Sequence, residues 1–205
     1  MMKTKLLCSQ FQFLAVVLLV ATGTAQLQAQ AAHSHLMTAQ PKRLTQSQGA
    51  LLQIVRDSTA RFKDVSAAEG AGYQLAFGCV TGPDAGAMGL HYVNGNLVAH
   101  PPLMPNGEPD PTQPQIVIYE PLADGSLHLI GADYLIFASV WDPAHPNQGA
   151  PQMMGQLFHY FEFPNRFGLP AFYTLHVWAW KNNPNGAFVN WHPNVSCATF
   201  SGQAQ

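Results

Sequence analysis

The chain has 205 residues, of which 47% are hydrophobic and only 10% are charged, and its formal net charge is −2. Basic residues form no cluster beyond Lys42-Arg43, so the attraction to phosphates on which nucleic-acid binding depends is missing. A nucleic-acid partner is therefore excluded, and the length suits one domain that buries a substantial core.

Residues 1–31 have the pattern of a secretory signal peptide. Lys3 and Lys5 form a positive start, residues 11–20 are almost wholly apolar, and Ala29-Gln30-Ala31 matches a signal-peptidase site. An earlier cut is also compatible, which places cleavage between Ala25 and Ala32. An uncleaved anchor is the alternative, but the apolar run is shorter than the about 20 residues that span a bilayer. We therefore expect a periplasmic or secreted protein with no stable membrane span after signal cleavage.

Two cysteines, Cys79 and Cys197, remain once Cys8 leaves with the signal peptide. In an oxidising compartment they predict one disulfide bond, which would close a loop of about 118 residues. Two buried free thiols, or soft metal ligands, are the alternatives. A disulfide of this span predicts that residues 44–205 form a single domain, preceded by a flexible segment at 32–43.

Residues 44–70 predict the long helix of this domain. Apolar side chains recur at spacings of three and four, and the opposite side carries amides and charges. Gly70 and Gly72 are typical of a helix C-terminus, and Gly49 suggests an early break.

After Tyr73 the pattern changes to short apolar runs separated by Pro, Gly, Asn and Asp, which is typical of strands. The expected strands are residues 74–80, 88–93, 115–119, 126–130 with 134–140, 155–163 (helix or strand) and 172–180. Asp124-Gly125 is a hairpin signal between apolar runs. These elements predict an α+β fold, in which one long N-terminal helix packs on a curved, mostly antiparallel sheet or half-barrel.

Histidines interrupt two of the apolar runs. Alternation along an extended strand puts Thr174, His176, Trp178 and Trp180 on one face, with aliphatic side chains on the other. His91 lies between Leu90 and Tyr92 in a second run. The mixed face of titratable and aromatic side chains is typical of a pocket wall, and we expect Trp178, Trp180, Tyr92 and Tyr134 to line that pocket.

A third polar side chain, Glu120, ends the apolar run before Pro121. A buried carboxylate is costly unless it is paired or bound to a cation. His91, Glu120 and His176 would together form a set of two histidines and one carboxylate, which binds divalent transition metals such as zinc, iron or copper and leaves coordination positions open.

Other assignments of these polar residues stay open. Glu120 can instead cap a turn or pair with Lys181 or Arg166. Asp133 is a competing carboxylate and His159 a competing imidazole, and either can replace a member of the trio.

The segments MGLHYVN, YEP and LPAFYTLHVWAWKNNPNGAFVNWHPNVSC resemble a group of bacterial exported proteins that share the long helix, the strand histidines and the terminal Val-Ser-Cys. The resemblance covers most of the chain after the signal peptide, and it implies no activity because none is established for the group.

The residues thus favour an exported protein that binds a divalent metal in an aromatic-lined pocket and acts on a small organic substrate. The alternatives are a non-catalytic module that binds an apolar small molecule, and a structural protein of the cell envelope.

Overall fold

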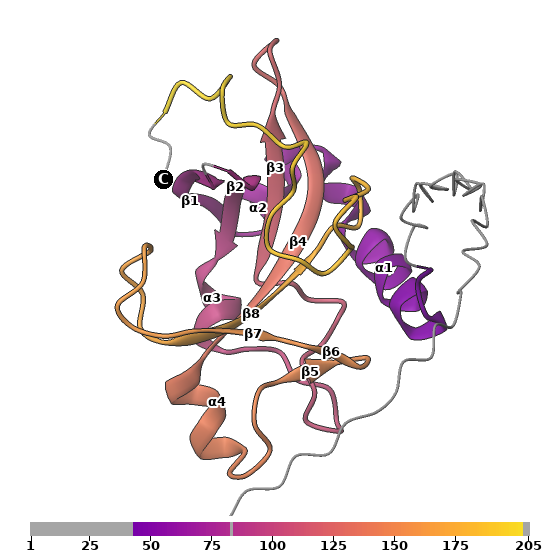
Figure 1. Cartoon of the computed structure of the whole chain (residues 1–205), viewed down its shortest axis with the longest axis vertical. Helices are drawn as coiled ribbons and strands as arrows, with labels where there is room; N and C mark the ends of the chain where they lie inside the picture. Colours follow the sequence, from indigo (N-terminus) through magenta and orange to yellow (C-terminus); the bar gives the residue numbers. More distant parts are fainter. Residues whose placement is uncertain (1–42, 83, 203–205) are drawn as a thin grey trace, which may run out of the picture. The chain divides into compact units, whose positions relative to one another are not determined.

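The computed structural model describes residues 43–82 and 84–202, so the predicted signal peptide and nearly all of the segment 32–43 lie outside the described residues. An N-terminal helix is followed by a six-stranded antiparallel sheet that curves into a half-barrel (Figure 1). The α+β fold predicted from the sequence is confirmed.

The long helix is interrupted once. It consists of α1 (Gln46–Thr59), the 3-10 turn η1 (Ala60–Lys63) and α2 (Val65–Gly70). Thr45 and Gln48 form a capping box at its start. The break expected near Gly49 is wrong, because that glycine lies inside α1. The interruption falls at Asp64, whose extended backbone stops η1 and whose carboxylate accepts a hydrogen bond from the Ser66 amide at the start of α2.

The sheet has the strand order β1-β2-β3-β4-β8-β7, and all neighbours are antiparallel. Its strands are β1 (Tyr73–Gly82), β2 (Gly86–Asn94), β3 (Ile116–Pro121), β4 (Leu127–Phe137), β8 (Phe172–Val177) and β7 (His159–Phe161). The remaining elements are α3 (Gly95–Ala99), α4 (Ala138–Ala144) and a small hairpin of β5 (Gln152–Met153) and β6 (Gln156–Leu157). The hairpin predicted at Asp124-Gly125 connects β3 to β4.

Three strand predictions differ from the structure by more than one or two residues at their ends. Residues 155–163, expected as one helix or strand, form the two short strands β6 and β7, and residues 138–140, expected as the end of a strand, lie in α4. Residues 126–130 and 134–140 were expected as separate runs, but β4 is continuous through Gly131. A side chain at that position would meet the Val177 carbonyl oxygen at 2.6 Å, so only glycine lets the two chains approach. The last strand ends at Val177 instead of residue 180, because the Trp180 and Lys181 amides turn to the carbonyl of Ile130.

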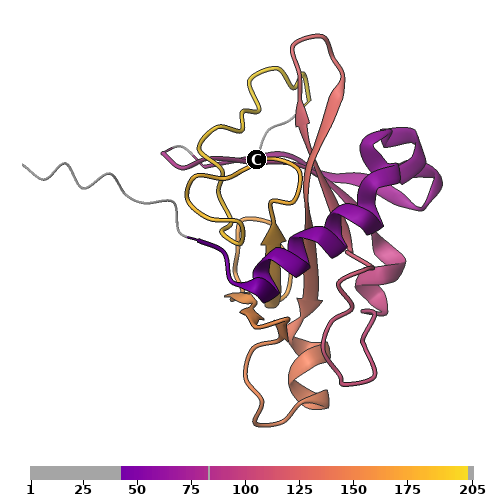
Figure 2. The same cartoon turned by 90° about the vertical axis from the view of Figure 1, so that its right-hand side faces the viewer.

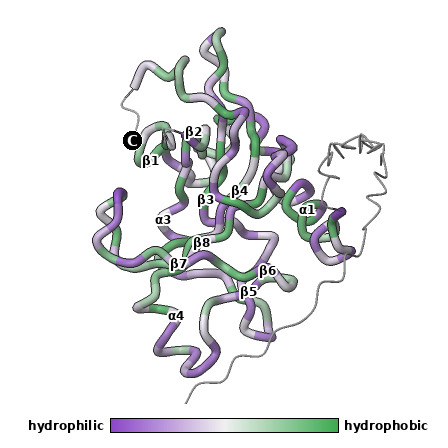
Figure 3. Tube along the Cα trace, viewed as in Figure 1, coloured by the Kyte–Doolittle hydropathy of each residue, from purple (hydrophilic) through white to green (hydrophobic). Residues whose placement is uncertain are grey.

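The two faces of the sheet have different partners. Leu51, Leu52 and Val55 of α1 pack against one face, where Tyr134 of β4 and Leu175 of β8 contribute to the same hydrophobic cluster. Figure 2 shows α1 lying across the strands, and Figure 3 shows hydrophobic and polar residues alternating along it. Because side chains alternate along a strand, His91 and His176 project from the opposite face of the sheet. Within the described ranges, no helix has the length and apolar character needed to cross a membrane.

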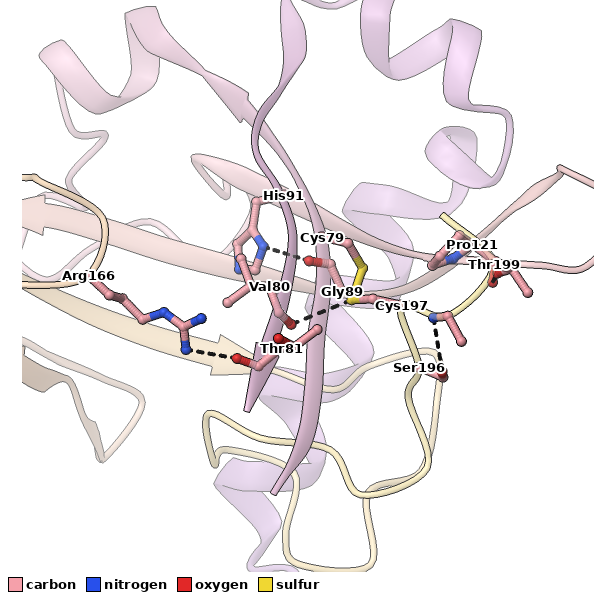
Figure 4. The surroundings of a disulfide bond; sticks show 11 residues. Cys79, Val80, Thr81, Gly89, His91, Pro121, Arg166, Ser196, Cys197 and Thr199 are labelled. Carbon is pink, nitrogen blue, oxygen red and sulfur yellow. Dashed lines mark hydrogen bonds between the residues drawn. A yellow bond between two sulfur atoms is a disulfide. The ribbon is translucent and has the colours of Figure 1, made fainter. Parts of the chain in front are cut away.

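The predicted disulfide bond between Cys79 and Cys197 is confirmed. It joins β1 to the C-terminal segment across a sequence separation of 118 residues (Figure 4). Both cysteines are buried in the core of the sheet.

We predict that replacing both cysteines with alanine lowers the free energy of unfolding by about 3 to 5 kcal/mol, because the unfolded chain regains the freedom that so long a closed loop removes. Urea unfolding of the two proteins, followed by tryptophan fluorescence, measures the difference. A loss below about 1 kcal/mol would show that the bond contributes little beyond the packing around it.

Candidate functional site

Three titratable side chains meet on the face of the sheet opposite α1. They are His91 of β2, Asp133 of β4 and His176 of β8, with exposed fractions of 5%, 3% and 3%. One nitrogen or oxygen atom from each lies within 4.8 Å of the others. The two imidazole centroids are 5.8 Å apart, and Nδ1 of His176 is 3.6 Å from Oδ1 of Asp133.

Strand register explains why these three residues meet. Asp133 and His176 are direct partners in the β4–β8 ladder, so their side chains project together from one face. His91 reaches them from a strand that is separated from β8 by both β3 and β4. The sheet must curve toward this face to bring the two histidines together.

Neighbouring groups fix the orientation of two members. Nδ1 of His91 donates a hydrogen bond to the Gly89 carbonyl at 3.1 Å, which leaves Nε2 with its lone pair free (Figure 4). The Thr174 hydroxyl donates to Oδ1 of Asp133 at 2.5 Å. Hydrogen bonds of this kind commonly hold metal-binding imidazoles and carboxylates in place.

His176 is the least satisfied member. Both of its ring nitrogens are buried and have no hydrogen-bond partner, and the same is true of the Asn190 side-chain oxygen. The Asn190 amide lies near enough to favour the protonated imidazole, but no hydrogen bond of good geometry joins the two. A buried nitrogen that lacks a partner is costly, and it is available to a ligand.

Burial also controls the charges of the cluster. Desolvation, reinforced by the neighbouring His176, lowers the pKa of His91 to about 4, and desolvation lowers the pKa of His176 to about 3. Desolvation raises the pKa of Asp133 to about 6. At neutral pH the cluster therefore holds two neutral imidazoles and a carboxylate that is mostly ionised.

Apolar side chains surround the cluster on its open side. The three residues line a small cavity of about 30 Å³ together with Met88, Ile116, Leu135, Leu169 and four phenylalanines. These phenylalanines, Phe77, Phe161, Phe167 and Phe172, contact one another through their rings and are called here the phenylalanine cover. The cavity has room for one or two water-sized occupants beside the polar atoms.

Glu120 does not lie beside the two histidines. The competing carboxylate, Asp133, occupies the position that was expected for Glu120. In the β3–β4 ladder Asp133 is opposite Ile116, whereas Glu120 is opposite His128. Four residues along an extended strand separate these positions by about 13 Å. Glu120 instead forms an ion pair with Lys181, whose Nζ is 2.6 Å from Oε2. This pair is one of the alternatives that the sequence left open for Glu120.

The four aromatic residues expected to line the pocket do not line this cavity. Tyr92 and Tyr134 directly follow His91 and Asp133 in their strands, so alternation turns them to the opposite face. Trp178 and Trp180 lie beyond the end of β8, where strand alternation no longer applies. Trp178 still packs beside His176, with ring centroids 6.1 Å apart.

The phenylalanine cover and Met88 were missed in the sequence. One signal was available, since Phe77 precedes Gly78 inside a predicted strand and a glycine there often marks a bulge. The structure has a bulge between Ala76 and Cys79, and Phe77 adopts a positive φ of 65°. The competing imidazole His159 is exposed on β7 and stays outside the cluster, although its charge would lower the pKa of His176.

Comparison of the chain with protein-family models, with curated proteins and with solved structures found no match. The residues of the site therefore carry the functional argument.

We predict that the free energy of unfolding of the metal-free protein falls as the pH is lowered from about 6.5 to 4. The unfolded chain protonates His91 and His176 in this range while the folded protein keeps them neutral. Asp133 acts in the opposite sense, because its raised pKa makes the folded state bind a proton first. Because two histidines lower the free energy of unfolding in this pH range and only one carboxylate raises it, we expect a net decrease.

Urea unfolding at a series of pH values measures this effect. In the variant His176→Asn, one proton fewer is taken up on unfolding. The slope of its free energy of unfolding against pH should therefore be smaller by roughly 1 kcal/mol per pH unit. His128→Asn, an exposed histidine on β4, is the matched control and should keep the slope of the unmodified protein. Equal slopes for His176→Asn and the unmodified protein would contradict the neutral state assigned to His176.

Proposed function

We propose that this protein binds a divalent transition metal through His91, Asp133 and His176. One observation carries the proposal: the acidic side chain of Asp133, which bears a negative charge when ionised, is buried within 4.8 Å of ligand atoms of two imidazoles, and one of these imidazoles has no hydrogen-bond partner. Among the described residues, neither lysine nor arginine pairs with Asp133. A cation would offset the cost of burying that charge.

The donor set suits a metal with open coordination positions. Nε2 of His91, a nitrogen of His176 and a carboxylate oxygen of Asp133 supply three ligands of the types that zinc, iron and copper accept. A metal held by three protein ligands acts as a Lewis acid on a molecule at a remaining position. The neighbouring Thr174 hydroxyl would orient the carboxylate and would itself stay outside the ligand set.

The lining of the cavity restricts what can reach the site. Outside the three ligands and Thr174, every lining residue is apolar, and the phenylalanine cover forms much of the wall. Charged molecules would lose their hydration on entering, so we infer that the substrate is small and uncharged, and that an organic substrate reaches the metal only when the phenylalanine cover moves. We also propose that the protein is exported and belongs with the bacterial proteins that its strand-histidine segments resemble; the disulfide supports an oxidising compartment.

A non-catalytic module that binds an apolar molecule is the second candidate. The apolar lining favours it, but about 30 Å³ is too little room for an organic molecule unless the phenylalanine cover moves. In that case the histidines would serve only as hydrogen-bonding groups.

We predict that protein purified without a histidine tag or chelator contains about one equivalent of zinc, iron or copper, measured by mass spectrometry of the metal content. The variants Asp133→Asn and His176→Gln should each retain less than about a tenth of an equivalent, because each removes one of three ligands. Glu120→Gln is the matched control and should retain the metal. No metal in the unmodified protein, with none taken up on titration, would favour the second candidate.

We further predict that Asp133→Asn makes the metal-free protein more stable at pH 8. The raised pKa of Asp133 shows that the folded state disfavours its charge, and the asparagine oxygen can still accept from Thr174. Thermal unfolding of metal-free samples measures the gain, which we expect to reach about 1 to 3 kcal/mol. Addition of zinc should then stabilise the unmodified protein and leave the variant unchanged. A less stable metal-free variant would point to a structural role for the charge.

A further inference from the structure

A second, larger pocket lies between α1 and the chain that follows β8. It has a volume of about 470 Å³, which is in the range of small-molecule sites. Its wall combines residues of the helix, Leu52 and Arg56, with the segment from Trp178 to Ala187. None of the metal-site residues lines it, and Trp178, which does line it, also packs beside His176.

The charges at this pocket are positive. Arg56 donates from Nε to the Ala179 carbonyl at 2.6 Å, which fixes the guanidinium plane and leaves its terminal N–H groups without an acidic partner in the described part of the chain. No aspartate or glutamate is among the described residues of the lining. Lys63 adds a second cation nearby, with Nζ 4.1 Å from the centroid of the Trp180 ring. A half-buried, fixed guanidinium is suited to bind a carboxylate through two parallel hydrogen bonds.

The opposite wall is held in place by its own hydrogen bonds. The buried Asn183 donates from its side chain to the Trp191 carbonyl and accepts from the Asn185 amide. The Trp178 amide donates to the Ala187 carbonyl and ties this loop back to the end of β8. A wall that is already ordered costs little entropy when a ligand binds.

The other residues that line the pocket indicate the chemistry of the rest of the ligand. Asn182 and Asn185 offer side-chain amides that can donate or accept hydrogen bonds, while Leu52, Trp178 and Trp180 supply apolar surface. We propose that this pocket binds a small organic carboxylate, with the acid group on Arg56 and an apolar body against Leu52 and Trp180. This site is independent of the proposed metal centre.

Titration with phenylacetate, followed by tryptophan fluorescence, tests the proposal, because two tryptophans line the pocket. We expect saturable binding of phenylacetate, and phenylacetamide, which has the same shape without the charge, should bind about tenfold more weakly or worse. Arg56→Gln should weaken phenylacetate binding by a similar factor. Arg61→Gln is the matched control, because that exposed arginine lies over Phe62 and does not line the pocket.

Three results would overturn the proposal: no saturable binding of phenylacetate, equal affinity for phenylacetate and phenylacetamide, or unchanged affinity in Arg56→Gln. If Arg56→Gln does not fold, Arg56→Lys takes its place, since it keeps the charge but loses the planar pair of donors. The comparison of the acid with its amide uses the unmodified protein and needs no variant. Metal content does not enter this test, so its outcome is separate from that of the metal proposal.

Discussion

The candidate metal site depends on the curvature of the sheet. His91 and His176 come from strands with two others between them, which in a flat sheet would lie about 14 Å apart. Two glycines allow the close approach: a side chain at Gly89 would meet the Tyr119 carbonyl oxygen at 2.6 Å, and one at Gly131 would meet that of Val177 at the same distance. A register shift between Ile118 and Tyr119 adds to the bend.

The same curvature creates an energetic conflict. It places a carboxylate and two imidazoles in an apolar cavity beneath the phenylalanine cover, where the imidazoles cannot be protonated at neutral pH and cannot neutralise Asp133. Such a cluster lowers the stability of the metal-free fold, because the charge is desolvated without a cationic partner. Binding a cation would reverse this cost, so the arrangement is better explained by a ligand than by the needs of the fold. Perturbed titratable groups gathered in one cavity are typical of functional sites.

Much of the fold, and part of the site, could be predicted from the sequence. Alternation along the predicted strands singled out His91 and His176 as polar residues on otherwise apolar elements, and cysteine counting predicted the disulfide. The choice between Glu120 and Asp133 depended on which residues are opposite each other in the β3–β4 ladder, and a single sequence does not determine register. Trp178 and Trp180 do not line the cavity of the metal site, because β8 ends at Val177 and the amides of Trp180 and Lys181 bond to the Ile130 carbonyl; they line the larger pocket beside α1 instead. The phenylalanine cover is assembled from β1, β7, β8 and a loop, so no local pattern reveals it.

The most direct test of the metal site is a crystal structure of the protein grown with zinc, with diffraction data collected on both sides of the zinc absorption edge. We predict one anomalous peak about 2.0 to 2.2 Å from Nε2 of His91, a ring nitrogen of His176 and a carboxylate oxygen of Asp133. An absence of anomalous signal in this cavity, or a peak bound by Glu120 instead, would contradict it.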